Sequence, residues 1–279
     1  MSQLFNKVFR KIKKIEGTWL RNNRATTMFE RQTDWDVLCI LDGCRYDTFQ
    51  KVNMLPGTLQ ARISRGSCTP EWAQAEIPQT ANNIVYVSAN PYVSEYYFAE
   101  EWQRSQPFYH LEEIWDTGWD DTLKTVPPRK VLAAGAQLLK KHPTKKIVLH
   151  FMQPHHPFIG KRGIREKTGW ESSRQTVLGQ PESRYGENVY DLLQHGKTTQ
   201  AEVISAYQDN LALVLSKIRT FLKQHITDQR VVITSDHGNC FGEYGLYAHP
   251  EATYIRELIQ VPWFTVENEA GSKKPVVSS

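Results

Sequence analysis

Cysteine is scarce in this sequence, and long apolar runs are missing from it. Only four cysteines occur in 279 residues, and none of them forms a CxxC pair, so the sequence indicates neither a disulfide framework nor a zinc knuckle. No window approaches the roughly 18 apolar residues of a membrane span, and the first residues lack the continuous apolar core of a signal peptide. These absences predict a cytoplasmic protein in a reducing compartment.

An excess of positive charge is also missing outside the first segment of the chain. The formal net charge is +4. Residues 1–24 contain seven lysines and arginines but one acidic residue, Glu16, so the remainder of the chain is slightly acidic. General nucleic-acid binding requires basic charge spread over the docking face. We therefore expect no nucleic-acid partner.

The first segment does contain a helical repeat of apolar residues. They recur every three or four positions with basic residues between them: Leu4, Phe5, Val8, Phe9, Ile12, Ile15 and Trp19. The pattern predicts a basic amphipathic helix over residues 3–22, within an N-terminal arm of residues 1–30. Such a helix lies on an anionic membrane surface, here at the inner membrane face, or packs on the body of the protein with its charged side in solvent.

The rest of the chain alternates short apolar runs with helical patterns. Five runs bounded by turn residues predict strands covered on both faces: 36–42, 83–90, 146–153, 230–236 and 261–266. Helical spacing predicts helices at 46–54, 70–77, 92–104, 128–142 and 199–224. The alternation predicts an α/β fold, in which a central sheet is layered between helices in one domain of residues 31–268. Functional groups are then expected at the carboxyl ends of the strands.

Residues 159–198 break this pattern, because they are polar, weakly periodic and rich in glycine, arginine and serine. So long a segment between a strand and a helix predicts a lid or substrate loop. A disordered excursion is the alternative. We expect the tail, residues 269–279, to be frayed.

Acidic and imidazole side chains follow three of the predicted strands. Asp42 follows the first strand, and Asp236 and His237 follow the fourth. Further histidines lie in a cluster at the end of the third strand and in the segment YGLYAHPE: His150, His155, His156 and His249. A divalent cation requires this kind of constellation. The alternatives are a cap or turn role for the aspartates and a rigid pocket wall for the histidines.

The segment SCTPEW, residues 67–72, predicts a helix start that faces the same edge. Pro70 suits the first helical turn because it has no N–H group to leave unpaired, and Thr69 is the predicted N-cap. Free backbone N–H groups there would attract an anion, and a metal would turn a nearby hydroxyl or thiol into a nucleophile. The alternative is that Thr69 only caps the helix.

An ordered set of motifs resembles a known family. ILDGCRYD, SCTPEW, the HxxxxHHPF segment, TSDHGNCFGEYG and AHP occur in the order typical of the sulfatase-like branch of the alkaline phosphatase superfamily, over roughly residues 34–266. The resemblance implies a three-layer α/β/α sandwich with a mostly parallel central sheet. It also implies a hydrolase or transferase of phosphate or sulfate esters that uses a covalent intermediate and a divalent metal ion (zinc, manganese, magnesium or calcium).

The resemblance assigns roles residue by residue. Asp42, Asp236 and His237 resemble the metal ligands of the family. The helix start, which holds Thr69 and Cys68, resembles the nucleophile site, and in the family the metal also binds the nucleophile. The remaining assignments are less specific. The histidines that would bind ester oxygens, protonate the leaving group or hold a further metal are His155 or His156, and His249. Arg45 resembles a residue that contacts an anion or has a structural role.

The sequence also departs from the family pattern. Sulfatases carry a CxPxR signature around a modified cysteine, whereas this chain has Cys68 followed at the arginine position by Trp72. A two-zinc site would need an aspartate in the third-strand loop, where this chain has Gln153. These departures favour a phosphate-ester enzyme with Thr69 as nucleophile and Cys68 as second choice. The alternatives are a sulfatase that uses modified Cys68, or a silent relative that binds a phosphorylated glycan or a membrane partner.

Overall fold

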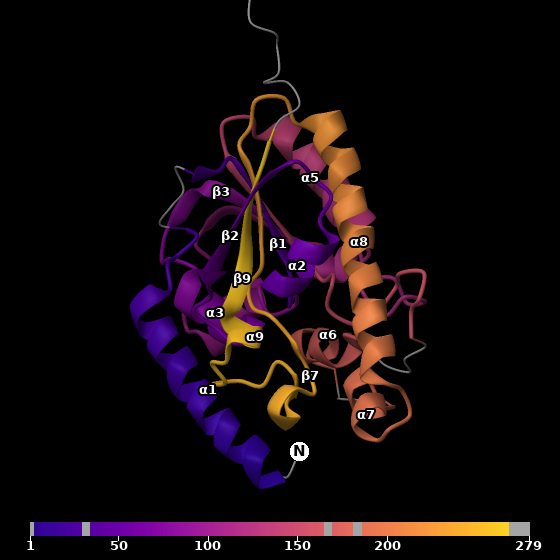
Figure 1. Ribbon diagram of the computed structural model, residues 1–279. Coiled ribbons are helices and arrows are strands. Elements are labelled where there is room, and N and C mark those ends of the chain that lie inside the picture. The colour runs from indigo at the N-terminus through magenta and orange to yellow at the C-terminus, as the bar shows by residue number, and fades with distance from the viewer. Residues whose placement is uncertain (1–2, 30–33, 165–168, 181–185, 268–279) are drawn as a thin grey trace, which may run out of the picture.

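A seven-stranded mixed sheet forms the centre of the protein (Figure 1). The computed structural model describes residues 3–29, 34–164, 169–180 and 186–267. The strand order is β2-β9-β6-β1-β5-β3-β4, and β9 alone in this sheet runs antiparallel to its neighbours. The strands of the sheet are β1 (Val37–Leu41), β2 (Gly57–Ile63), β3 (Ala81–Ser88), β4 (Phe108–Glu113), β5 (Lys146–Phe151), β6 (Val231–Thr234) and β9 (Gln260–Val266).

Helices surround this sheet and connect its strands. The longer helices are α1 (Gln3–Arg24), α2 (Tyr46–Val52), α3 (Thr69–Glu76), α5 (Pro128–Lys141), α6 (Glu171–Val177), α7 (Val189–Gln194) and α8 (Gln200–His225). The short elements are η2 (Tyr97–Glu101), α4 (Ile114–Thr117), η3 (Glu243–Gly245), α9 (Arg256–Ile259) and the small hairpin of β7 (Cys240–Phe241) and β8 (Tyr247–Ala248).

The core lies on both faces of the sheet. Alternate residues of β1 point to opposite faces, so Val37, Cys39 and Leu41 pack against α5 and α8, while Leu38 and Ile40 pack with the α3 side. All five are fully buried, which explains why β1 is a continuous apolar run. The predicted three-layer α/β/α arrangement is therefore confirmed.

Several element predictions need correction. β2 and β4 were not predicted, because edge strands are partly exposed and carry no continuous apolar run. The predicted helix over 92–104 is only the π-helical turn η2.

The polar segment 159–198 contains α6 and α7 within its described part, and the predicted tail lies outside the described residues. No helix among the described residues is both long and apolar enough to cross a membrane.

Candidate metal centre and active site

Polar side chains from four strands meet at the carboxyl edge of the sheet. Asp42 follows β1, Asn90 follows β3, His150 lies near the end of β5, and Asp236 and His237 follow β6. All five side chains are fully buried. Because parallel strands end at the same edge, segments that are far apart in sequence come together here.

Thr69 completes this group from the first turn of α3. Its hydroxyl donates to Asp236 Oδ2 at 2.8 Å and lies 3.2 Å from His237 Nε2. Asn90 Nδ2 lies 3.3 Å from the same hydroxyl oxygen. The predicted N-cap role of Thr69 is wrong, because the helix begins at Thr69 and Cys68 is the N-cap residue. The Thr69 side chain therefore faces the buried carboxylates instead of closing its own helix.

The two aspartates are held close together without a balancing cation among the described side chains. Asp236 Oδ1 accepts hydrogen bonds from the backbone N–H groups of Gly43 and His237, and Asp42 Oδ2 accepts from Asn90. Asp42 Oδ1 is buried and has no hydrogen-bond partner. Burial and the neighbouring Asp236 raise the pKa of Asp42 well above its usual value. A buried carboxylate with an unused oxygen is the environment that a metal ion relieves.

The tautomer of His237 also favours a metal ion at this position. Its Nδ1–H donates to the Gly238 carbonyl at 2.7 Å, and burial lowers its pKa to about 4, so the ring is neutral and Nε2 carries a lone pair. That lone pair faces Asp236 Oδ2 at 3.3 Å and Asp42 Oδ1 at 3.7 Å. Three potential metal-ligand atoms thus lie close together. A backbone carbonyl on the second nitrogen is also typical of metal-binding histidines.

His150 adds a fourth donor; the sequence placed it in the histidine cluster but gave it no specific role as a ligand. Its Nε2 is buried without a hydrogen-bond partner and lies 3.9 Å from Asp236 Oδ2, while its Nδ1 contacts the Tyr86 hydroxyl at 2.9 Å. Burial lowers the pKa of His150 to about 4, so the ring is available as a neutral ligand. Ligand atoms of Asp42, His150 and Asp236 all lie within 4.8 Å of one another. The donor set therefore fits a divalent metal ion.

Two further predicted histidines border this centre. His155 Nδ1–H donates to the His156 carbonyl at 2.8 Å, which leaves His155 Nε2 as the acceptor of a 2.8 Å bond from His249 Nε2–H. The ring of His249 lies 4.6 Å from that of His237. The ring of His156 lies on the outer side of His155, because it contacts the rings of His155 at 4.4 Å and of Tyr190 at 5.3 Å. The structure thus brings His155 and His249, but not the ring of His156, against the centre.

Asn210 on α8 holds the loop that carries these histidines. Its side-chain amide donates to the carbonyls of Pro154 and His155, and its oxygen accepts from the backbone N–H of Ile159. Asn210 is fully buried. In the sequence, Asn210 is a polar residue within the otherwise apolar face of the helix. That pattern could have identified it as a buried residue with a structural role.

Arg45 and Cys68 occupy other environments. Arg45 forms ion pairs with Asp47 and Glu243 and donates to the Asn239 carbonyl, which is the pattern of a structural contact. Cys68 is buried, and desolvation raises the pKa of its thiol to about 12. A thiol that stays protonated at neutral pH is a poor nucleophile.

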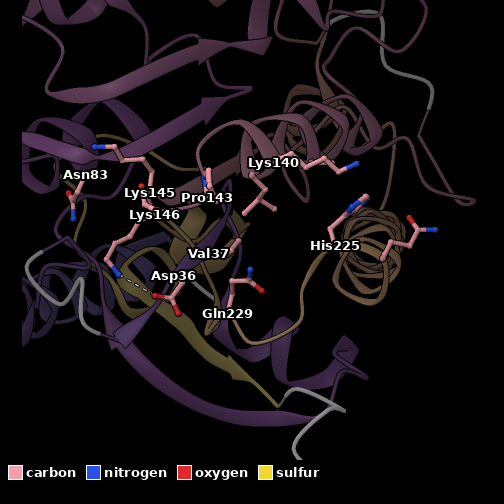
Figure 2. A pocket seen from close by; sticks show the side chains of 13 residues that line it. Asp36, Val37, Asn83, Lys140, Pro143, Lys145, Lys146, His225 and Gln229 are labelled. Atoms are coloured by element: carbon pink, nitrogen blue, oxygen red, sulfur yellow. Dashed lines mark ion pairs between the residues drawn. The ribbon is translucent and has the colours of Figure 1, made fainter.

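A separate hollow of about 450 Å³ lies at the opposite end of the sheet (Figure 2). It is bordered by the amino ends of β1 and β5 and by the end of α8. Lys146 crosses one side of it to form a 3.5 Å ion pair with Asp36. This hollow is remote from the carboxyl edge and is not part of the candidate site.

Comparison with known proteins finds similarity in fold. No family profile matches the sequence, and no curated protein matches it. The soluble domain of lipooligosaccharide phosphoethanolamine transferase A from Neisseria meningitidis matches with a TM-score of 0.54 at 12% identity, over 84% of this chain and 76% of that chain. A C-terminal periplasmic domain of a phosphoethanolamine transferase from Campylobacter jejuni matches with a TM-score of 0.52 at 14% identity, over 84% and 79%. A 2-O GAG sulfatase matches with a TM-score of 0.50 at 12% identity, over 83% and 64%.

These matches contradict the predicted cytoplasmic location. The matching Campylobacter jejuni domain is periplasmic. The prediction depended on the few unpaired cysteines and on the lack of an apolar leader. All four cysteines are buried and free, and a buried thiol is protected from oxidation in any compartment, so cysteine usage did not identify one.

The sheet order, the position of the buried carboxylates and the structural matches agree with one another. The fold that the sequence motifs implied is confirmed. The chain shares the fold of these phosphoethanolamine transferase domains and of the sulfatase.

Proposed function

We propose that the protein is a metal-dependent hydrolase or transferase that acts on phosphate esters through a covalent intermediate on Thr69. One observation carries the proposal. The Thr69 hydroxyl lies 2.8 Å from Asp236 Oδ2 and 3.2 Å from His237 Nε2, beside the unpartnered Asp42 Oδ1 and His150 Nε2. A hydroxyl at the edge of a predicted cation site, on the first turn of a helix, is placed to become a nucleophile.

The side chains present suggest a division of labour. Asp42, Asp236, His237 and His150 would hold a divalent cation, which supplies Lewis acidity toward the ester and lowers the pKa of the Thr69 hydroxyl. Asp236 Oδ2 accepts the hydroxyl proton. As Thr69 Oγ1 bonds to phosphorus, the bond to the alcohol oxygen breaks in line with it.

His249 is the candidate hydrogen-bond donor to the departing oxygen. Its Nε2–H currently donates to His155, and an ester oxygen entering between the rings would take that hydrogen bond instead. Burial lowers the pKa of His249 to about 3, so the ring is neutral; its Nε2–H would stabilise the charge on the departing oxygen through a hydrogen bond, and solvent would supply the proton. Water or a second alcohol would then release the phosphoryl group from Thr69.

The sulfatase alternative is less well supported by the site. Cys68 has a raised thiol pKa, and Trp72, which replaces the signature arginine, is fully buried in the core. A phosphate ester carried by a lipid or a glycan therefore remains our proposed substrate, in keeping with the transferases that share the fold.

A matched pair of variants tests the proposal. Turnover of an aryl phosphate, an aryl phosphodiester and an aryl sulfate would be measured with manganese, zinc, magnesium and calcium. We expect Thr69→Ala to reduce phosphate-ester turnover by at least about 1,000-fold, Thr69→Ser to retain part of it, and Cys68→Ala to retain nearly all. Sulfate turnover that is lost in Cys68→Ala and kept in Thr69→Ala would overturn the assignment.

A further inference from the structure

The N-terminal helix α1 is docked on the body largely through polar contacts and a close backbone approach. Arg10 donates from Nε and Nη2 to the Tyr244 carbonyl at 3.1 and 2.7 Å, and Arg21 Nε donates to the Arg65 carbonyl at 2.7 Å. Between them Gly17 is buried against the backbone of Tyr254 so tightly that an added Cβ would lie 1.4 Å from its carbonyl oxygen. The contact face of α1 therefore contains arginines, a glycine and the partly buried Leu20, which packs against Ile255, Leu258 and Ile259.

The apolar side of α1 points away from the body. The exposed fractions are 50% for Val8, 54% for Ile12, 63% for Ile15 and 54% for Trp19. Their spacing of four, three and four residues aligns them on one helix face. A surface helix ordinarily buries this face against the core and exposes its charges. Here much of the apolar side is exposed instead, and a contiguous apolar stripe of this kind marks a docking site.

Basic side chains border one flank of this stripe. A shallow hollow there is lined by Lys7, Lys11 and Lys14 together with Ile15 and Trp19. The single acidic residue of the helix is already engaged, since Glu16 pairs with Lys13 and Arg256. The outward face thus combines apolar side chains with uncompensated positive charge.

We propose that this outward face of α1, made of Val8, Ile12, Ile15 and Trp19 and flanked by Lys7, Lys11 and Lys14, docks on an anionic lipid bilayer. The stripe enters the headgroup boundary, and the lysines contact the anionic headgroups. A second copy of this helix is a poorer partner, because its exposed face offers the same lysines and no free carboxylate for them.

The position of α1 determines which end of the protein would face the membrane. The helix runs past α3 and α9 at the end of the molecule that holds the candidate site (Figure 1). Arg21 lies 4.0 Å from Glu71, two residues after Thr69 on α3. Membrane docking would therefore hold the carboxyl edge of the sheet near the lipid surface. The docking proposal stands on the helix alone and does not depend on the catalytic proposal.

Vesicle flotation of the full chain tests the proposal. The probes are phosphatidylcholine vesicles with about 30% phosphatidylglycerol, compared with phosphatidylcholine alone. We expect binding to the anionic vesicles only, weakened by raised salt. Replacing the stripe in the triple variant Ile12→Gln, Ile15→Gln, Trp19→Gln, or the flank in Lys7→Gln, Lys11→Gln, Lys14→Gln, should reduce the partition coefficient by at least about tenfold.

Met54→Gln is the matched control, since Met54 is 84% exposed but lies outside α1. It should bind like the unmodified chain, and the thermal unfolding midpoint of each variant reports whether the body is intact. Absence of binding to anionic vesicles, equal binding to neutral ones, or unchanged binding by the stripe variant would overturn the proposal. Sedimentation showing a dimer that the stripe variant abolishes, without vesicle binding, would assign the face to a second copy instead.

Discussion

At the scale of single residues, the main feature is a cluster of electron-pair donors that lacks a positive partner. Three ligand atoms lie close together and are buried from solvent: Asp42 Oδ1, His150 Nε2 and His237 Nε2. Such an arrangement is costly in the metal-free chain. The cost itself makes the metal site testable without any assay of activity.

We predict that Asp42→Asn stabilises the metal-free protein and removes its response to metal. The amide keeps the shape of the carboxyl group but carries no charge, so the repulsion from Asp236 disappears. The free energy of unfolding should rise by about 1–2 kcal/mol without metal. Added zinc, manganese, magnesium or calcium should no longer raise the unfolding midpoint, whereas it should raise that of the unmodified chain.

Asp228→Asn is a suitable control for this variant, because Asp228 is exposed. It should leave both the metal-free stability and the response to metal unchanged. A metal-induced shift that survives in Asp42→Asn would argue against the ligand set proposed here.

The site residues differ in how well sequence could predict them. Asp42, Asp236 and His237 follow apolar runs directly, so the rule that sites gather at strand ends was enough. Asn90 obeys the same rule but resembles an ordinary turn residue. His150 lies inside a strand and is aligned only by sheet register, in which it pairs with Ile40 on β1 and Ser88 on β3. The register between strands cannot be predicted from the spacing of residues along the chain.

At the scale of elements, α1 depends on a close backbone contact. Gly17→Ala should detach the helix, because its Cβ would overlap the Tyr254 carbonyl. We expect trypsin to cleave within α1 faster in this variant, with a loss of about 1–3 kcal/mol in the stability of docking. Thr18→Ala, at the exposed neighbouring position, should leave the cleavage rate nearly unchanged. Equal rates for both variants would show that the contact is not decisive.

The strands show why some elements escaped prediction. β1, β5 and β6 lie inside the sheet and are buried on both faces, so they are continuous apolar runs. The edge strands β2 and β4, GTLQARI and FYHLEE, mix polar and apolar residues without a strict period. Their strand conformation comes from pairing with β9 and β3, which is a long-range property.

At the scale of the whole molecule, buried neutral histidines link stability to pH. Burial lowers the pKa of His150 and His237 to about 4, of His249 to about 3, and of His155 well below its usual value. The unfolded chain binds protons at these groups below about pH 6.5, whereas the folded chain does not. Their contribution to stability is therefore present above pH 6.5 and is lost as pH falls toward 4.

We predict that the metal-free protein loses up to about 1.4 kcal/mol per pH unit for each of these histidines between pH 6 and 4.5. The raised pKa of Asp42 acts in the opposite direction, but it is one group against four. Urea unfolding at constant ionic strength across this range provides the measurement. A free energy of unfolding that stays flat from pH 7 to 4.5 would show that these rings are solvated or already charged.

The placement of β9 between β2 and β6 has a consequence for how the protein is made. β2 has no other neighbour in the sheet, so it cannot take its place until a strand encoded far downstream has left the ribosome. The chain that follows β2 leads directly to the turn before Thr69. We therefore expect the segment that carries Thr69 to reach its final position late in folding.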